Sequence, residues 1–277
     1  MRATTPTTQA VILARGLGTR MRSDTGAPLA DEQARAADTG AKAMMPFARP
    51  FIDYVLSALA DGGITAAVLV IGPEHTKVRD YFERTRVGRR VHIEFAVQAE
   101  PRGTADALLA ARAAITSLTA DCFLSLNADT YYQSQAFAAL AALGTSGLIG
   151  FDADALVRES NIEPERVLRY ALIEADADGW LRAIHEKPPA NHPLALRAQR
   201  WVSMNVWSFT PRIFDACALV HPSPRGELEL ADAVTIAMRD LGEPFRVVPM
   251  HAGILDLSHR SDVASVATRL ASITPRP

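Results

Sequence analysis

Cysteine is nearly missing from this sequence: Cys122 and Cys217 are the only two in 277 residues. Both stand in apolar surroundings, the first in a strand-like run and the second in a helix-like segment. Two isolated thiols provide neither a disulfide framework nor the paired spacing of a zinc site. Their scarcity excludes a disulfide-stapled secreted domain and favours a reducing cytoplasm as the location.

A basic excess and long apolar runs are missing as well. The chain has 29 Lys and Arg against 31 Asp and Glu, a formal net charge of −2, whereas general nucleic-acid and membrane-surface binders carry a basic excess. Residues 1–8 are polar, and no run approaches membrane-spanning length. We therefore expect a soluble cytoplasmic protein that binds neither nucleic acid nor membranes, with any phosphate binding due to local charge.

The sequence does contain an alternation of apolar strand-like runs and helix-like segments. Hydrophobic residues make up 48% of the chain, enough for a substantial core in one large domain or two joined lobes. The alternation predicts an α/β fold with a Rossmann-like, mostly parallel sheet flanked by helices. Strands are expected at residues 11–14, 66–71, 92–97 and 122–126, and helices at 50–60, 77–84 and 104–115.

The pattern changes after residue 150. A hairpin is predicted from strands at 170–174 and 180–185 around the Asp and Gly residues of 176–179. We interpret residues 1–150 as a nucleotide-binding half and 151–277 as a mixed half that forms the other wall of a cleft, within one compact domain. Further strands are expected at 202–209 and 245–250, and helices at 211–218, 230–241 and 261–273.

A glycine loop follows the first strand and is closed by an arginine. Glycines let the backbone approach an anion closely, and Arg20 adds a charged fork suited to phosphate oxygens. A plain strand-to-helix turn is the alternative. The loop lacks the Gly-Lys-Ser/Thr ending of a P-loop and the third glycine of the dinucleotide fingerprint, so it predicts a different nucleotide cradle. Its sequence is Leu13-Ala14-Arg15-Gly16-Leu17-Gly18-Thr19-Arg20-Met21.

Two carboxylates stand directly after apolar strand-like residues. Asp129 follows the run 122–126, and Asp256 follows Ile254-Leu255. Ligands of open α/β sheets bind beyond the carboxyl ends of the strands, and one or two carboxylates suit Mg²⁺. The alternative for each aspartate is a loop or helix cap.

The remaining candidates are polar residues at the edges of predicted elements. Lys42 precedes the first long helix, and Glu186-Lys187 follows the predicted strand 180–185. Surface charges and an exposed ion pair are the alternatives. Gln98 closes the third strand, and its amide can pair with a base edge. Gly103-Thr104 opens a helix whose first N–H groups are free donors. No Ser/His/Asp or Cys/His set stands out.

In their order these segments resemble the sugar-1-phosphate nucleotidyltransferase family, which includes glucose-1-phosphate thymidylyl- and uridylyltransferases. The resemblance covers Ala10 to about Val266. The glycine loop is similar to the family's Leu-Ala-(Ala/Gly)-Gly-x-Gly-Thr-Arg-(Leu/Met) signature. The other similar segments are Lys42 with Pro46 and Arg49-Pro50, Gln98 with Pro101-Arg102-Gly103-Thr104-Ala105, Asn127-Ala128-Asp129, Glu186-Lys187-Pro188, Gly226-Glu227-Leu228-Glu229-Leu230-Ala231-Asp232, and Asp256.

The resemblance implies an enzyme that joins a nucleoside triphosphate and a sugar 1-phosphate, with Mg²⁺ as cofactor. It implies that Arg20 and Lys42 act on the phosphates and that Asp129 and Asp256 hold the metal. Relatives often form dimers or tetramers, which leaves a homo-oligomer open. The resemblance assigns the nucleotide to Leu13, Ala14, Gly16, Gly18, Thr19, Gln98, Gly103 and Thr104, and the sugar phosphate to Asn127, Glu186, Lys187, Asn205 and Trp207.

Three departures from the family pattern stand out. Arg15 replaces a small residue and adds either a phosphate contact or a blocking side chain. Residues 23–40 form an unusually long acidic and alanine-rich insert, expected as a flap. Asn205 and Trp207 replace glycine and tyrosine and predict a reshaped sugar pocket. Two other functions stay open: a non-catalytic regulatory or scaffolding member of the fold, and a nucleotidyltransferase that acts on a non-sugar phosphate.

Overall fold

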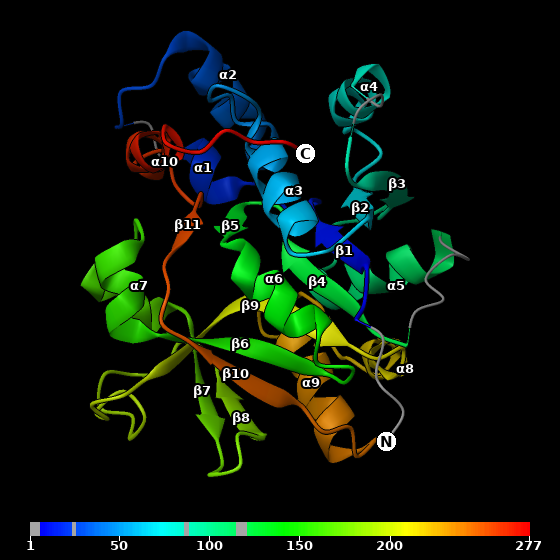
Figure 1. Cartoon of the computed structure of the whole chain (residues 1–277), viewed down its shortest axis with the longest axis vertical. Helices are drawn as coiled ribbons and strands as arrows, with labels where there is room; N and C mark the ends of the chain where they lie inside the picture. The colour runs from blue at the N-terminus through cyan, green and yellow to red at the C-terminus, as the bar shows by residue number, and fades with distance from the viewer. Residues whose placement is uncertain (1–5, 24–25, 86–88, 115–120) are drawn as a thin grey trace.

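The computed structural model describes residues 6–23, 26–85, 89–114 and 121–277. Within them a nine-stranded sheet has the order β10-β6-β9-β4-β1-β2-β3, and β7 pairs with both β8 and β9 (Figure 1). Its strands are β1 (Gln9–Leu13), β2 (Ala66–Ile71), β3 (His92–Val97), β4 (Phe123–Asn127), β6 (Gly147–Asp152), β7 (Ala171–Ala175), β8 (Leu181–His185), β9 (Trp201–Phe209) and β10 (Arg246–Met250). A separate pair joins β5 (Thr130–Tyr132) and β11 (Ile254–Asp256).

The sheet is mixed. Strands β3, β2, β1 and β4 run parallel, with Val11 opposite both Val68 and Ser125. Strand β9 is antiparallel to its neighbours β4 and β6, while β10 is parallel to β6. The predicted α/β fold with a mostly parallel sheet is confirmed. Because β9 pairs with β4, one continuous sheet crosses residue 150.

Alternating residues of the strands feed two apolar cores, one on each face of the sheet. Ile12 and Leu69 belong to the core under α3 and α6, whereas Val11 and Val68 belong to the core under α5, α8 and α9 (Figure 1). Both faces are covered, as expected for parallel strands with near-continuous apolar runs. The helices are α1 (Thr19–Ser23), α2 (Asp31–Thr39), η1 (Lys42–Met44), α3 (Phe51–Asp61), α4 (Thr76–Arg84), α5 (Thr104–Ala114), α6 (Ser134–Ala141), α7 (Ala153–Glu159), η2 (Pro164–Arg169), α8 (Arg212–Ala218), α9 (Leu230–Arg239) and α10 (Asp262–Leu270).

The predicted elements are present with small differences at their ends, and the hairpin of β7 and β8 is confirmed. The sequence-based assignment missed β5, β6, β11, α1, α2, α6, α7, η1 and η2. The insert of residues 23–40 contains helix α2, while its residues 24 and 25 lie outside the described part. Both cysteines are buried and free. Among the described helices, none has the length and apolar character needed to cross a membrane.

Candidate active site

A cavity of about 350 Å³ opens where the carboxyl ends of β1 and β4 meet the loops that follow them. This is the edge of the sheet at which parallel α/β folds bind ligands. Many of the predicted site residues line it, although they come from distant parts of the chain. These residues are Leu13, Ala14, Gly16, Gly18, Thr19, Arg20, Lys42, Gln98, Gly103, Thr104, Asn127 and Asp129.

The glycine loop is fitted against the end of the insert. Gly18 has a φ of +59°, and a Cβ on it would lie 2.6 Å from Cα of Gly40. A Cβ on Gly40 would in turn lie 2.5 Å from the carbonyl oxygen of Leu17. The two backbones therefore touch, and no larger residue fits between them. Arg20, in the short helix α1, is exposed and lines the cavity.

Arg15 is held by acceptors of the protein itself. Its Nε donates to the carbonyl oxygen of Gln98 at 3.2 Å, and its guanidinium pairs with Glu74 at 2.7 Å. The residue is 8% exposed. Arg15 therefore ties the glycine loop to the strand end at Gln98. Neither of the two expected roles, an added phosphate contact or a blocking side chain, is needed to explain it.

Lys42 and Asp129 form an ion pair in the cavity. Nζ of Lys42 lies 2.8 Å from Oδ2 of Asp129, with the two side chains 14% and 27% exposed. Lys42 begins η1 directly after the insert, and Asp129 follows β4. Lys42 and Asp129 thus share one wall of the cavity although they come from distant parts of the chain.

Asp256 lies beside Asp129 through the pairing of β11 with β5. The N–H of Leu257 donates to the carbonyl oxygen of Asp129 at 2.9 Å. Asp256 is 5% exposed, and its Oδ2 accepts from Arg166 at 2.7 Å and from the Tyr170 hydroxyl at 3.2 Å. Burial, and then the nearby charge of Asp129, raises the pKa of Asp256 to about 6. Asp129 is therefore close enough for its charge to oppose the ionisation of Asp256.

The start of α5 is paired with the segment before α9. The N–H of Ala105 donates to the carbonyl oxygen of Leu228 at 2.9 Å, and Oγ1 of Thr104 accepts from the N–H of Leu230 at 2.9 Å. The expectation of free donors at this helix start is therefore wrong for Ala105. Gly103 has a φ of +119°, and a Cβ on it would lie 2.5 Å from the carbonyl oxygen of Leu228. Only glycine fits there.

Glu186 and Lys187 lie at the end of β8, outside the lining of the cavity. Lys187 is exposed and has a φ of +44°, rare for a residue with a side chain. Desolvation by the surrounding protein raises the pKa of Glu186, and the charge of Glu229 raises it further. The charges of Lys187 and Arg225 oppose this shift. Sequence reasoning missed Arg225, although it directly precedes the Gly-Glu segment it had singled out.

Asn205 and Trp207 have different environments despite their closeness in β9. Asn205 is exposed with a φ of +59°, beside the end of β4 because Val206 pairs with Leu126. Trp207 is 1% exposed and stacks on Phe209 at 5.6 Å between ring centroids. Trp207 is a core residue, so its expected place in a sugar pocket is corrected to a packing role.

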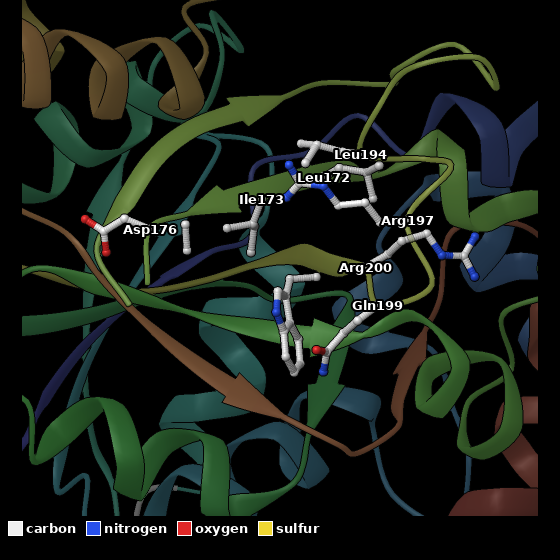
Figure 2. A pocket seen from close by; sticks show the side chains of 9 residues that line it. Leu172, Ile173, Asp176, Leu194, Arg197, Gln199 and Arg200 are labelled. Atoms are coloured by element: carbon white, nitrogen blue, oxygen red, sulfur yellow. The ribbon is translucent and has the colours of Figure 1, made fainter. Parts of the chain in front are cut away.

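A second cavity of about 340 Å³ lies over β7 and the start of β9. Leu172, Ile173 and Leu194 gather along it, with Asp176 at one end (Figure 2). None of the predicted site residues lines this second cavity. Most of the predicted site residues therefore line the first cavity, whereas Asp256, Glu186, Lys187, Asn205 and Trp207 lie outside its lining.

Comparisons with known proteins show the family and the fold of this chain. The sequence pattern of the nucleotidyl transferase family matches residues 9–249. The UTP–glucose-1-phosphate uridylyltransferase AglF of Haloferax volcanii is 26% identical over 96% of this chain and 98% of its own length. The glucose-1-phosphate thymidylyltransferase of Streptomyces antibioticus is 28% identical over 97% of this chain and 68% of its own. The crystal structure of a UDP-glucose pyrophosphorylase complexed with UDP-glucose has the same fold, with a TM-score of 0.70, 18% identity and 96% and 99% of the two chains covered.

Proposed function

Because the chain belongs to the nucleotidyl transferase family, we propose that it joins a nucleoside triphosphate and a sugar 1-phosphate to give a nucleotide-sugar and pyrophosphate. The observation that carries this proposal is the convergence of Lys42, Asp129 and Asp256 beside a glycine loop that ends in Arg20. Residues 1–150 then bind the nucleotide and 151–277 the sugar phosphate. Free buried thiols favour a cytoplasmic location.

The reaction forms a bond between a phosphate oxygen of the sugar phosphate and the α-phosphorus. It breaks the bond from that phosphorus to the bridging oxygen, which leaves with pyrophosphate. A phosphate monoester has a second pKa of about 6, so the nucleophile is ionised at neutral pH and needs no general base. Catalysis then depends on positioning and on charge placed around the α-phosphate.

The side chains that line the cavity supply that charge. Arg20 holds the departing pyrophosphate, and Lys42 contacts the phosphates at the reacting centre. Lys187 and Arg225 lie near Glu186 and meet the phosphate of the sugar, while Glu186 accepts hydrogen bonds from sugar hydroxyls. Asn127 is the last residue of β4 and Asn205 lies in the middle of the adjacent strand β9, and together they complete the sugar side.

The donor set suits Mg²⁺. Asp129 and Asp256 are neighbouring carboxylates whose mutual repulsion a cation relieves. In the described part of the chain no group of three or more His, Cys, Asp or Glu could hold a metal, and Mg²⁺ usually takes one or two carboxylates and completes its shell with phosphates and water. When bound there, Mg²⁺ would offset charge on the phosphate oxygens.

Pyrophosphate release across a matrix of nucleoside triphosphates and sugar 1-phosphates, with and without Mg²⁺, tests the function. We expect release with at least one pair and only with the metal. Pyrophosphate release only with a non-sugar phosphate would instead favour a nucleotidyltransferase that acts on a non-sugar acceptor. No release with any pair would favour a regulatory or scaffolding role, in which Lys42 and Arg166 permanently neutralise the two carboxylates.

A further inference from the structure

The side-chain amide of Gln98 is held from one side by two hydrogen-bond acceptors. Its Nε2 donates to the carbonyl oxygen of Gly103 at 3.0 Å and to Oδ2 of Asp106 at 2.7 Å. The other oxygen of Asp106 accepts from Arg102 at 2.6 Å, so both oxygens of this carboxylate act as acceptors. Neither partner of the amide therefore has a hydrogen to give.

These two acceptors determine which end of the amide remains for a ligand. An amide group has two donor hydrogens on nitrogen and an oxygen that only accepts. Gly103 and Asp106 engage the nitrogen end, so Oε1 is the end left over. Turning the amide round would set Oε1 against a carbonyl oxygen and a carboxylate together, and would leave both buried acceptors without a donor. Gln98 therefore offers the cavity an acceptor.

The backbone of Gln98 is also fixed. Its N–H donates to the carbonyl oxygen of Ile71 at 2.9 Å, and its carbonyl oxygen accepts from Arg15 at 3.2 Å. Gln98 is 3% exposed and Asp106 is 8% exposed. Because the backbone of Gln98 is held in place, only the rotation of its side-chain amide decides which atom faces the cavity. Asp106 is the side chain that restricts this rotation.

We propose that Asp106 is a positioning residue that makes the cavity select uracil or thymine over cytosine, an inference that rests on the proposed function for the presence of a base beside Gln98. Uracil and thymine carry an N–H at ring nitrogen 3, whereas cytosine has a bare acceptor nitrogen there. The three rings have nearly the same shape, so shape does not separate them. An acceptor at Gln98 pairs with the N–H and opposes the lone pair of cytosine. Among the pyrimidine nucleotides, the substrate is thus UTP or dTTP.

Isothermal titration of UTP and CTP into wild-type protein and Asp106→Asn tests this inference without turnover. A buried hydrogen-bonding group that faces a mismatched partner lowers the affinity on the order of ten- to a hundredfold. We therefore expect the wild-type protein to bind UTP about thirtyfold more tightly than CTP. Asparagine at this position can donate as well as accept, which lets the Gln98 amide turn. The UTP preference of Asp106→Asn is therefore expected to fall to about threefold.

Asp215→Asn is the matched control. Asp215 is an exposed carboxylate of α8 that pairs at 3.3 Å with Arg112 of α5, the helix that carries Asp106. Its replacement is expected to leave both affinities unchanged. Because the ratio of two affinities is measured on one preparation, a smaller folded fraction of a variant does not alter it.

Equal affinity of wild type for UTP and CTP would overturn the inference. So would a preference that Asp106→Asn leaves unchanged, or an equal loss of both nucleotides, which would mean a merely structural residue. Selective UTP binding without pyrophosphate release from any sugar phosphate would instead contradict the proposed reaction while supporting the role of Asp106. Absence of binding by every nucleotide would overturn both.

Discussion

Nζ of Lys42 lies 2.8 Å from Oδ2 of Asp129, although 87 positions separate the two residues in the chain. The lysine arrives from the short helix η1 after the insert, and the aspartate from the end of β4. A fixed ammonium and a carboxylate that suits Mg²⁺ thus share one wall of the cavity. This arrangement makes the charges around the proposed reacting centre testable one at a time.

Lys42→Ala and Arg20→Ala are each expected to lower kcat about a hundredfold or more, since each removes a preorganised charge from the phosphates. Steady-state rates of pyrophosphate release measure the effect. Lys77→Ala, an exposed lysine in α4, is the control and should keep full activity. Near-wild-type turnover in either site variant would mean that the phosphates lie elsewhere.

Asp129→Asn is expected to abolish Mg²⁺-dependent activity while the fold stays intact, because an amide oxygen lacks the charge that holds the metal. Activity across a Mg²⁺ titration and the thermal unfolding midpoint report the two effects separately. Asp178→Asn, at the exposed turn of the β7–β8 hairpin, should change neither. Normal metal dependence in Asp129→Asn would refute the ligand assignment.

Asp38→Ala is expected to raise the KM for the nucleotide about tenfold with a smaller effect on stability. Asp38, in the insert helix α2, pairs with Arg260, whose Nε donates to the carbonyl oxygen of Met21 at 2.9 Å. This link braces the glycine loop, and small displacements of binding groups are costly. Deletion of residues 24–38, of which 24 and 25 lie outside the described part, should act in the same way.

Asp31→Asn, at the other end of α2, is the control for the insert because Asp31 is exposed. Initial rates at varied nucleotide and fixed sugar phosphate give the KM values. An unchanged KM in Asp38→Ala and in the deletion would mean that the insert has no role in nucleotide binding.

Asp53→Ala is expected to lower the free energy of unfolding by about 3–5 kcal/mol, the usual cost of leaving a buried charge unpaired. Asp53 is fully buried and accepts hydrogen bonds from Arg49, Arg89 and Tyr81. Urea denaturation measures the loss. Asp61→Ala, which breaks the exposed pair with Arg90, should cost about 0–1 kcal/mol. Equal losses of unfolding free energy in the two variants would contradict a stabilising role for the buried network around Asp53.

Burial raises the pKa of Cys122 to about 11 and that of Cys217 to about 12. The folded state therefore disfavours the thiolates, and stability is expected to fall as the pH rises above 9, the ordinary value, toward these values. At pH 8 iodoacetamide should label neither thiol in the native protein and both in urea. Rapid native labelling, read by mass spectrometry, would contradict this burial.

Local sequence patterns were sufficient for most of the fold. Strand β2 matches the predicted residues because its apolar run is long and ends at Gly72-Pro73. Strand β3 also matches, since it begins with an alternation of polar and apolar residues that is typical of a strand. Strand β6 was missed because Gly147 and Gly150 interrupt its apolar residues. Strands β5 and β11, three residues each, form only because they pair with each other across 124 positions.

The sequence could not separate Asn205 from Trp207. Residues two apart in a regular strand share a face, so both were assigned to the sugar pocket. In the structure the alternation is kept, since Met204 and Val206 both belong to the core on the other face of the sheet. The two residues differ in exposure: Asn205 has a left-handed backbone and is exposed, whereas Trp207 is buried in the core under α5, α8 and α9. A positive φ at a residue other than glycine depends on neighbouring strands that hold it, and local sequence does not encode them.

The sequence by itself determined the glycine loop, the alternation of strands and helices and the set of chemical groups available, because these depend on residues close along the chain. Only the tertiary structure decided which of those groups meet. Lys42 reaches Asp129, Asp256 settles beside Asp129, and Asp106 orients Gln98 because distant segments pack at one edge of the sheet. Ion pairs and hydrogen bonds act over a few ångströms and in fixed directions, so partners are set by three-dimensional packing.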